Sequence, residues 1–258
     1  MTPGVRALPV VWAICRRTWL KILRRPVTLS FSLVQPLLWM AFFGFLFQRY
    51  EITQASKVRY LDFLVPGVCA MTVLFGASQS GIGWIRDLHS GFLQRMLQSP
   101  ARPSALLAGK VAADVMRLLV QALAVLLLAW ILGARVRVVG AEVLFGVLCL
   151  ACFAAAFSSL SCVIALRSRA QEAMAVYVHL VNMPMLFTSS ALVPTKQMPD
   201  WLARIAEWNP LTLTVDALRA GLLPQFRADR VAPVVLAILA ALLFSLAARE
   251  MARLDRTG

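Results

Sequence analysis

The chain has few charged residues and few groups that could carry acid–base chemistry. Charged residues make up 15% of its 258 positions, against 60% hydrophobic residues, and there are 2 histidines. A soluble domain carries about 25% charged residues. This chain therefore lacks the polar atoms to cover a water-exposed surface, which excludes an ordinary soluble enzyme.

Cysteine and phosphate-binding motifs are also too sparse to indicate a cofactor. Cys149 and Cys152 have a C-x-x-C spacing, but no histidine or second cysteine pair lies near them, so we expect packing residues and no metal site. The stretch "SALLAGKV" ends in Gly-Lys yet has serine at 104 and valine at 111, where a phosphate-binding loop needs glycine and Ser/Thr. We expect no catalytic residue and no nucleotide bound by this chain.

Long apolar runs are what the chain does have. A run of roughly 20 apolar residues matches the ~30 Å hydrocarbon layer when it is helical, and strands of a barrel would be about half as long and would alternate. We therefore predict an all-α integral membrane protein in which residues 1–258 form one transmembrane domain. The six predicted spans are 29–47, 62–84, 109–132, 142–166, 173–193 and 231–247.

The surplus of basic residues indicates the topology. The N-terminal segment, residues 85–110, residues 167–172 and the tail after 248 together carry 15 Lys/Arg and 4 acids. The other connections carry 10 Lys/Arg and 7 acids, so their basic excess is much smaller. Because positive residues favour the cytoplasmic side, both termini are expected there. The net charge of +14 would then serve to attract anionic lipid headgroups, and nucleic acid is not an expected partner.

Residues 5–25 predict an amphipathic helix lying in the membrane interface. Trp12, Cys15 and Trp19 recur at helical spacing, while the basic residues occupy another face. The helix is either a lipid anchor alone or also a cytoplasmic contact. The basic residues in question are Arg17, Lys21 and Arg24.

Residues 85–100 predict a second short helix, on the cytoplasmic side. Ile85, Leu88, Phe92 and Met96 follow steps of three and four, and the prolines of "SPARPS" end the pattern. The segment either rests on lipid or presents side chains to a soluble partner.

Residues 195–224 predict an outer helical hairpin that enters the membrane and returns. Asn209 and Pro210 suit a cap and first turn, and Trp201 and Trp208 suit the membrane–water boundary. Each half of this segment is too short to span the membrane.

The predicted spans contain few ionisable groups. Asp114 and Arg117 are three residues apart on one helix face and are expected to pair, as a packing device or as part of a gate or path. The absence of a longer relay of such groups argues against an ion-driven transporter. The candidate path residues are aromatic, methionine or amide side chains in two spans: Phe42, Phe43, Asn182, Met183, Met185 and Phe187.

Four features together resemble the permease subunits of type 2 ABC exporters, most closely the daunorubicin-resistance-type drug permeases. They are the N-terminal helix, "YLDFLVPGVCAMTVLF", "IRDLHSGFLQRMLQSPARPSALLAGK" and "LVPTKQMPDWLARIAEWNPLTLTVDALR". The sequence departs from the pattern at "TSSALVP", where a glycine often precedes the proline. The resemblance implies that residues 85–100 form a coupling helix against an ATPase subunit. The implied coupling residues are Arg86, Asp87, Leu88, Gly91, Phe92 and Arg95.

The resemblance also implies an assembly of two permease copies, expected to be a homodimer, and two ATPase subunits that bind ATP and Mg. The implied location is the bacterial plasma (inner) membrane. The expected activity is export of an amphipathic small molecule, drug or antibiotic, with a polysaccharide, lipooligosaccharide or lipid-linked glycan as the alternative cargo. A non-ABC ion-driven transporter, a membrane assembly subunit and an intramembrane enzyme are the alternatives from other classes.

Overall fold

The computed structural model describes residues 7–23, 26–47, 58–98, 101–137, 140–227 and 229–257. All elements of regular structure longer than three residues in this part of the chain are α-helices, as predicted. They are α1 (Ala7–Leu23), α2 (Pro26–Leu46), α3 (Tyr60–His89), α4 (Phe92–Leu97), α5 (Pro103–Ile131), α6 (Glu142–Ser168), α7 (Gln171–Phe187), the 3₁₀ turn η1 (Thr195–Gln197), α8 (Asp200–Trp208), α9 (Pro210–Leu222) and α10 (Ala232–Thr257).

Four helices are long and apolar enough to cross a membrane: α3, α5, α6 and α10. They confirm the predicted spans at 62–84, 109–132, 142–166 and 231–247. Within α2, residues Val34–Leu46 form a shorter apolar helix. The protein is therefore a helical membrane protein, with four long apolar helices and further shorter ones.

The predicted span at 173–193 is wrong in its extent. Helix α7 ends at Phe187, and at 1.5 Å per residue its 17 residues cover about 26 Å. The hydroxyl of Thr188 donates to the Pro184 carbonyl at 2.8 Å, and that of Ser189 donates to the Leu186 carbonyl at 2.7 Å. Such local side-chain bonds compete with continuation of a helix, so the "TSS" that looked like part of a span ends it instead.

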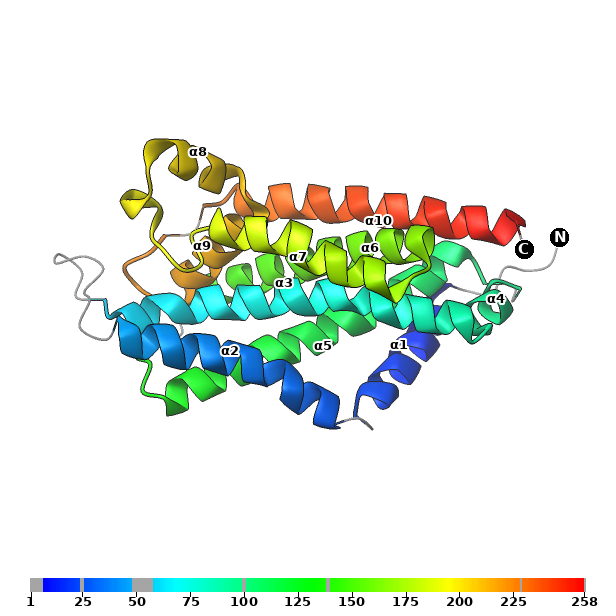
Figure 1. Ribbon diagram of the computed structural model, residues 1–258, viewed down its shortest axis with the longest axis horizontal. Helices are drawn as coiled ribbons and strands as arrows, with labels where there is room; N and C mark the ends of the chain where they lie inside the picture. The colour runs from blue at the N-terminus through cyan, green and yellow to red at the C-terminus, as the bar shows by residue number, and fades with distance from the viewer. Residues whose placement is uncertain are drawn as a thin grey trace.

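Helix α3 forms the centre of the bundle and is buried along most of its length. Helices α2, α5, α6, α7 and α9 pack around it, and α10 packs along α6 (Figure 1). Helices α8 and α9 lie at one end of the molecule, which we call the hairpin end. Helix α4 and the C-terminal part of α10 lie at the other, which we call the α4 end (Figure 1).

Helix α1 packs on α5, which changes the prediction that its apolar face simply rests on lipid. Ile14 and Cys15 are buried, whereas Trp12 is 68% exposed. A Cβ added at Gly109 of α5 would lie 2.8 Å from the Val11 carbonyl oxygen, so the two backbones meet closely there. The apolar stripe of this helix is divided between protein contact and an exposed tryptophan.

Candidate functional site

The predicted helix over 85–100 is in fact divided. Helix α3 continues to His89, five residues past the predicted span, and α4 begins only at Phe92. Gly91 between them has a φ of +65°, a left-handed conformation that glycine adopts without strain. The chain turns sharply here, so the four residues of the predicted stripe belong to two helices joined by a corner.

Replacing Gly91 by alanine is expected to lower stability by about 1 kcal/mol, because a Cβ is disfavoured at this φ. The matched control is Gly83→Ala, since a Cβ there would make only ordinary contact with Lys110. In the interior of α3 that change should stabilise by about 0.5–1 kcal/mol. Thermal unfolding in detergent should therefore shift in opposite directions, and a shared direction would contradict the role of Gly91.

Lys110 holds this corner to α5. Its ammonium group donates to Asp87 at 2.7 Å and lies 3.8 Å from the ring centroid of Trp84. Both charged side chains are largely buried, with exposed fractions of 9% for Lys110 and 15% for Asp87. Asp87 therefore contacts the protein's own α5, a role that sequence reasoning did not assign to it.

Phe92 connects the corner to α1. The guanidinium of Arg17 lies 3.4 Å from the centroid of the Phe92 ring, a cation–π contact. The corner also contacts the loop between α6 and α7, because His89 Nε2 lies 3.2 Å from the Arg169 carbonyl oxygen. Residues of the two segments predicted to be cytoplasmic thus lie together. The Lys21 side chain and the whole of Arg24 lie outside what the structure describes.

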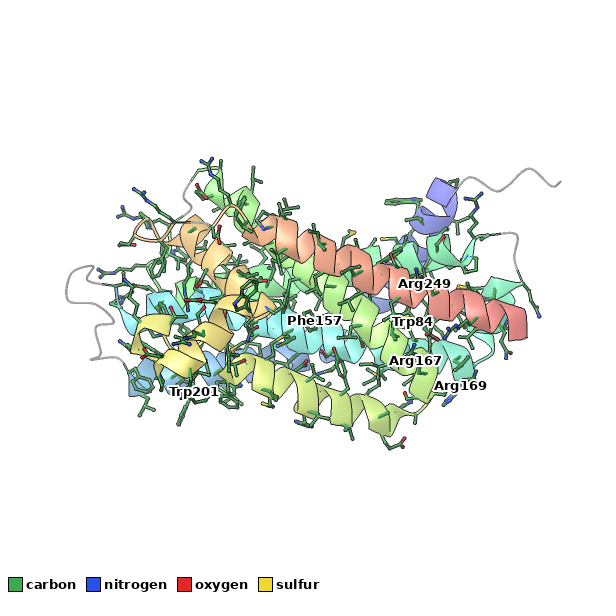
Figure 2. All side chains as sticks on the ribbon, turned by 90° about the horizontal axis from the view of Figure 1, so that it is seen from above. Trp84, Phe157, Arg167, Arg169, Trp201 and Arg249 are labelled. Atoms are coloured by element: carbon green, nitrogen blue, oxygen red, sulfur yellow. The ribbon has the colours of Figure 1, made fainter. Side chains whose placement is uncertain are left out.

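Exposed arginines surround the corner. Arg86 and Arg95 point outward, whereas Leu88 packs against the core beneath. Arg167, Arg169 and Arg249 add to the positive charge at the same end of the molecule (Figure 2). Arg167 is partly neutralised, because it pairs with Glu250. The corner therefore has a basic outer surface, and the residues beneath that surface are buried and well packed.

The intramembrane pair forms as predicted. Arg117 Nε lies 3.8 Å from Asp114 Oδ1, and Arg117 also donates to the Gly76 carbonyl of α3 at 3.1 Å. Both side chains are mostly buried. The pair therefore joins α5 to α3 within the bundle.

The six candidate path residues are not gathered in one place. Phe42 and Phe187 are more than 60% exposed, whereas Phe43, Met183 and Met185 pack partly against the core. Asn182 is fully buried and exchanges hydrogen bonds of 2.8 and 3.0 Å with Ser78 of α3. In the described residues, α2 and α7 make their main contacts with α3 and not with each other.

The hairpin end contains two helices of different character. Asn209 caps α9 as predicted, accepting from the Leu211 amide at 2.9 Å, and Pro210 occupies its first position. Leu211 and Val215 of α9 are buried, whereas Trp201 and Trp208 of α8 are 65% and 87% exposed. Figure 2 shows Trp201 at the opposite end from Arg167 and Arg169.

A buried arginine that sequence reasoning missed organises this end. Arg219 of α9 is 1% exposed. It donates to Ser190 O at 2.6 Å, to Ser190 Oγ at 3.0 Å and to Asp216 at 2.9 Å, and it lies 3.6 Å from the Phe63 ring centroid. Burial lowers the pKa of Arg219 to about 10, with Asp216 opposing the shift, so the side chain stays charged at neutral pH. The signal was present in Asp216-x-x-Arg219, the same spacing as Asp114-x-x-Arg117.

Comparisons with known proteins agree with this architecture. Residues 9–223 match the family described as ABC-2 type transporter. The chain is 30% identical over 213 residues to the protein named "Putative transport permease ycf38" of Cyanophora paradoxa, covering 81% of this chain and 72% of that one. It is 28% identical over 194 residues to the daunorubicin resistance ABC transporter permease protein DrrB1 of Streptomyces coeruleorubidus, covering 75% and 68%.

The family match covers most of the chain and includes most of α1, the α3–α4 corner and α9. Proteins of this family are non-catalytic transmembrane permeases that work with ABC ATPase subunits. The chain belongs to the ABC-2 type transporter family of membrane permeases.

Proposed function

We propose that this permease exports an amphipathic small molecule, such as a drug or antibiotic, when a separate ATPase subunit binds and hydrolyses ATP. The observation that carries the proposal is the α3–α4 corner, with its buried Lys110–Asp87 pair beneath exposed Arg86 and Arg95. A rigid corner can transmit a displacement to α3, and α3 contacts most of the bundle. The permease of S. coeruleorubidus, named for daunorubicin resistance, supports a drug-like cargo.

The assembly that we propose has two copies of this chain, two ATPase subunits and a path between the permease copies. The exposed Phe42 and Phe187 are available to face that path. The α4 end, with the C-terminal part of α10, would lie in the cytoplasm of a bacterial cell, and we propose the same side for both ends of the chain. The hairpin of α8 and α9 would enter the outer leaflet, with Trp201 and Trp208 at its boundary.

The energy for transport must come from the ATPase, because a conformational change requires a difference in binding free energy between the two states. We assign the surface contact to Arg86 and Arg95, which are exposed. Leu88, Gly91 and Phe92 would instead shape and hold the corner. Movement of the corner would reach α1 through the cation–π contact between Phe92 of the corner and Arg17 of α1.

The test is the affinity between the purified permease and its cognate ATPase. The double variant Arg86→Glu Arg95→Glu should weaken binding about tenfold, because glutamates would replace arginines at the proposed contact with the ATPase and reverse the charge there. Arg204→Glu is the matched control, since it is an exposed arginine on α8 at the hairpin end. Unchanged affinity in the double variant would remove these residues from the contact, and failure of any ATPase to bind would overturn the proposal.

A further inference from the structure

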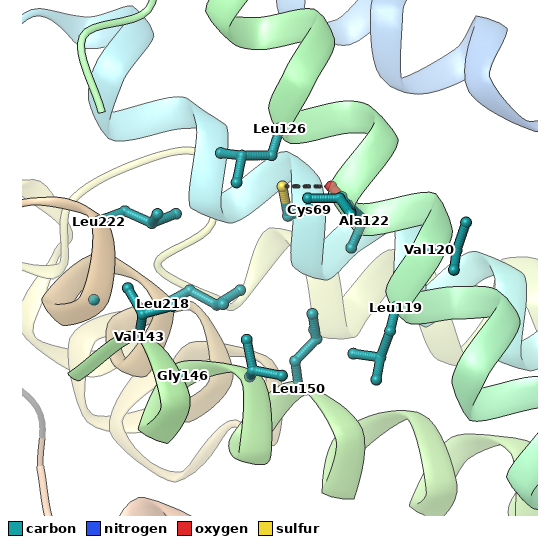
Figure 3. Close-up of a pocket in the computed structure, with 13 residues that line it drawn as sticks. Cys69, Leu119, Val120, Ala122, Leu126, Val143, Gly146, Leu150, Leu218 and Leu222 are labelled. Carbon is teal, nitrogen blue, oxygen red and sulfur yellow. Dashed lines mark hydrogen bonds between the residues drawn. The ribbon is translucent and has the colours of Figure 1, made fainter. Parts of the chain in front are cut away.

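An apolar groove of about 310 Å³ lies between α5, α6 and α9 (Figure 3). Its volume is roughly twice the 150 Å³ of an engineered cavity that binds benzene. The lining side chains are apolar, with Cys69 of α3 at the back, where its thiol donates to the Ala122 carbonyl at 3.6 Å. The groove is separate from the α3–α4 corner and from the candidate path residues.

Two glycines form the floor where α6 and α9 cross. A Cβ at Gly146 would lie 3.0 Å from the Ala217 carbonyl oxygen, and one at Gly221 would lie 2.8 Å from Val143 Cα. The helix backbones therefore meet directly, and the larger side chains on both sides leave the hollow above them. Packing of this chain itself creates the groove.

The groove is open toward the membrane. Val120 and Leu123 of α5 are 52% and 53% exposed, and Val147 of α6 is 41% exposed. These residues lie within helices that are long and apolar enough to span the bilayer. The opening therefore faces hydrocarbon, and an apolar chain can enter it from the side.

Two arginines stand at one end of the groove. The segment between α5 and α6 carries exposed Arg135 and Arg137, and the Arg137 amide donates to the carbonyl of Leu222, a groove residue, at 3.0 Å. Two acids belong to this end as well: Glu142 begins α6, and Asp62 accepts from the Arg135 amide at 2.6 Å while it pairs with a third base, Arg59. This end is thus polar and net positive directly beyond an apolar slot.

We infer that the groove binds one acyl chain of an anionic phospholipid of the surrounding membrane, whose phosphate lies against Arg135 and Arg137. The apolar slot matches the chain, because burial of each methylene group contributes about 0.8 kcal/mol. The two guanidinium groups match the phosphate, because each basic residue near a membrane surface attracts anionic lipid by about 1 kcal/mol. This inference does not depend on the transported cargo or on the ATPase contact.

The experiment uses phosphatidylglycerol with a photoactivatable diazirine near the end of one acyl chain, added to the purified full-length permease in lipid nanodiscs. After irradiation, labelled residues are mapped by peptide mass spectrometry. Labelling should concentrate on the groove residues of α5 and α6. Even labelling of all membrane-facing helices would overturn the inference.

Two variants test the two parts of the site. Val147→Phe should reduce groove labelling about tenfold. The larger side chain would fill part of the groove, and an acyl chain that can no longer bury roughly two of its methylene groups there binds about tenfold more weakly. Its matched control is Leu148→Phe, since Leu148 is the next residue on α6, is 53% exposed and does not line the groove. Equal labelling of both variants would contradict occupation of the groove.

Arg135→Gln Arg137→Gln should reduce labelling by phosphatidylglycerol about tenfold and leave labelling by phosphatidylcholine nearly unchanged. Arg204→Gln on α8 is the control. Arg135 and Arg137 are exposed and do not line the groove, so changing them leaves the shape of the groove unaltered. Equal loss with both lipids, or no loss with either, would overturn the assignment of the phosphate.

Discussion

Replacing Lys110 by methionine is expected to cost about 3 kcal/mol of stability, one of the two largest effects that the structure predicts for a single substitution. The variant leaves the Asp87 carboxylate, which is 15% exposed, without its 2.7 Å partner. It also removes the cation from the face of Trp84, which is fully buried. Removing one member of a buried ion pair costs more than removing both, because the remaining buried charge loses the opposite charge that it was paired with.

The measurement is thermal unfolding of the purified permease in detergent, followed by tryptophan fluorescence. A loss of 3 kcal/mol corresponds to a fall in Tm of roughly 6–12 °C for a domain of this size. Lys196→Met, which changes an exposed lysine near the hairpin end, should leave Tm unchanged. Asp87→Asn combined with Lys110→Met should recover part of the loss.

The same variants separate stability from coupling. If the pair fixes the angle of the corner, Lys110→Met should also reduce stimulation of the ATPase at temperatures where the variant remains folded. The double variant should restore stability more fully than stimulation, because it removes the buried charge without restoring the link. A Lys110→Met protein with wild-type Tm would show that the pair does not hold the corner.

Replacing Arg219 by methionine, a separate variant at the opposite end of the molecule, is expected to cost about 3 kcal/mol of stability as well. The guanidinium satisfies both the carbonyl and the hydroxyl of Ser190. Ser190 lies in the irregular segment after α7, where buried backbone groups need partners. Methionine fills similar space but donates no hydrogen bond.

Hydrogen exchange distinguishes a local from a global effect of this change. Exchange at residues 189–192 should accelerate in Arg219→Met more than exchange in the middle of α3. The segment depends on Arg219 and on two other donors or acceptors, because Tyr60 donates to the Leu192 carbonyl at 3.0 Å and the Ser190 amide donates to Thr212 at 3.1 Å. Arg204→Met on exposed α8 is the control, and unchanged exchange at 189–192 would contradict the role of Arg219.

The long spans could be predicted from sequence because their signal is local. A run of apolar residues in α3, α5, α6 or α10 identifies a helix whatever it packs against. The end of α7 could not be placed in this way, since Ser189, Ser190 and Ala191 are small enough to continue a span. Only their hydrogen bonds and the close approach of Gly67 to Ala191 show that the chain leaves the helix there.

The candidate site was predicted in part for the same reason. The Asp114–Arg117 pair and the Asn209 cap involve neighbours in sequence, and both are present. The Lys110–Asp87 pair joins residues 23 positions apart, and the Arg219–Ser190 bonds join residues 29 apart. Such contacts depend on the crossing of helices, so the distant partners of Lys110 and Arg219 could be recognised only in the structure, although the spacing of Asp216 and Arg219 is visible in the sequence.

We propose that a separate ATPase drives this permease through its α3–α4 corner, and ATP hydrolysis in proteoliposomes tests this proposal most directly. The cognate ATPase is measured alone, with the wild-type permease and with Arg86→Glu Arg95→Glu. We predict that the wild-type permease changes the hydrolysis rate and that the double variant leaves the ATPase at its rate without permease. A rate unaffected by the wild-type permease, or affected equally by both proteins, would contradict the claim.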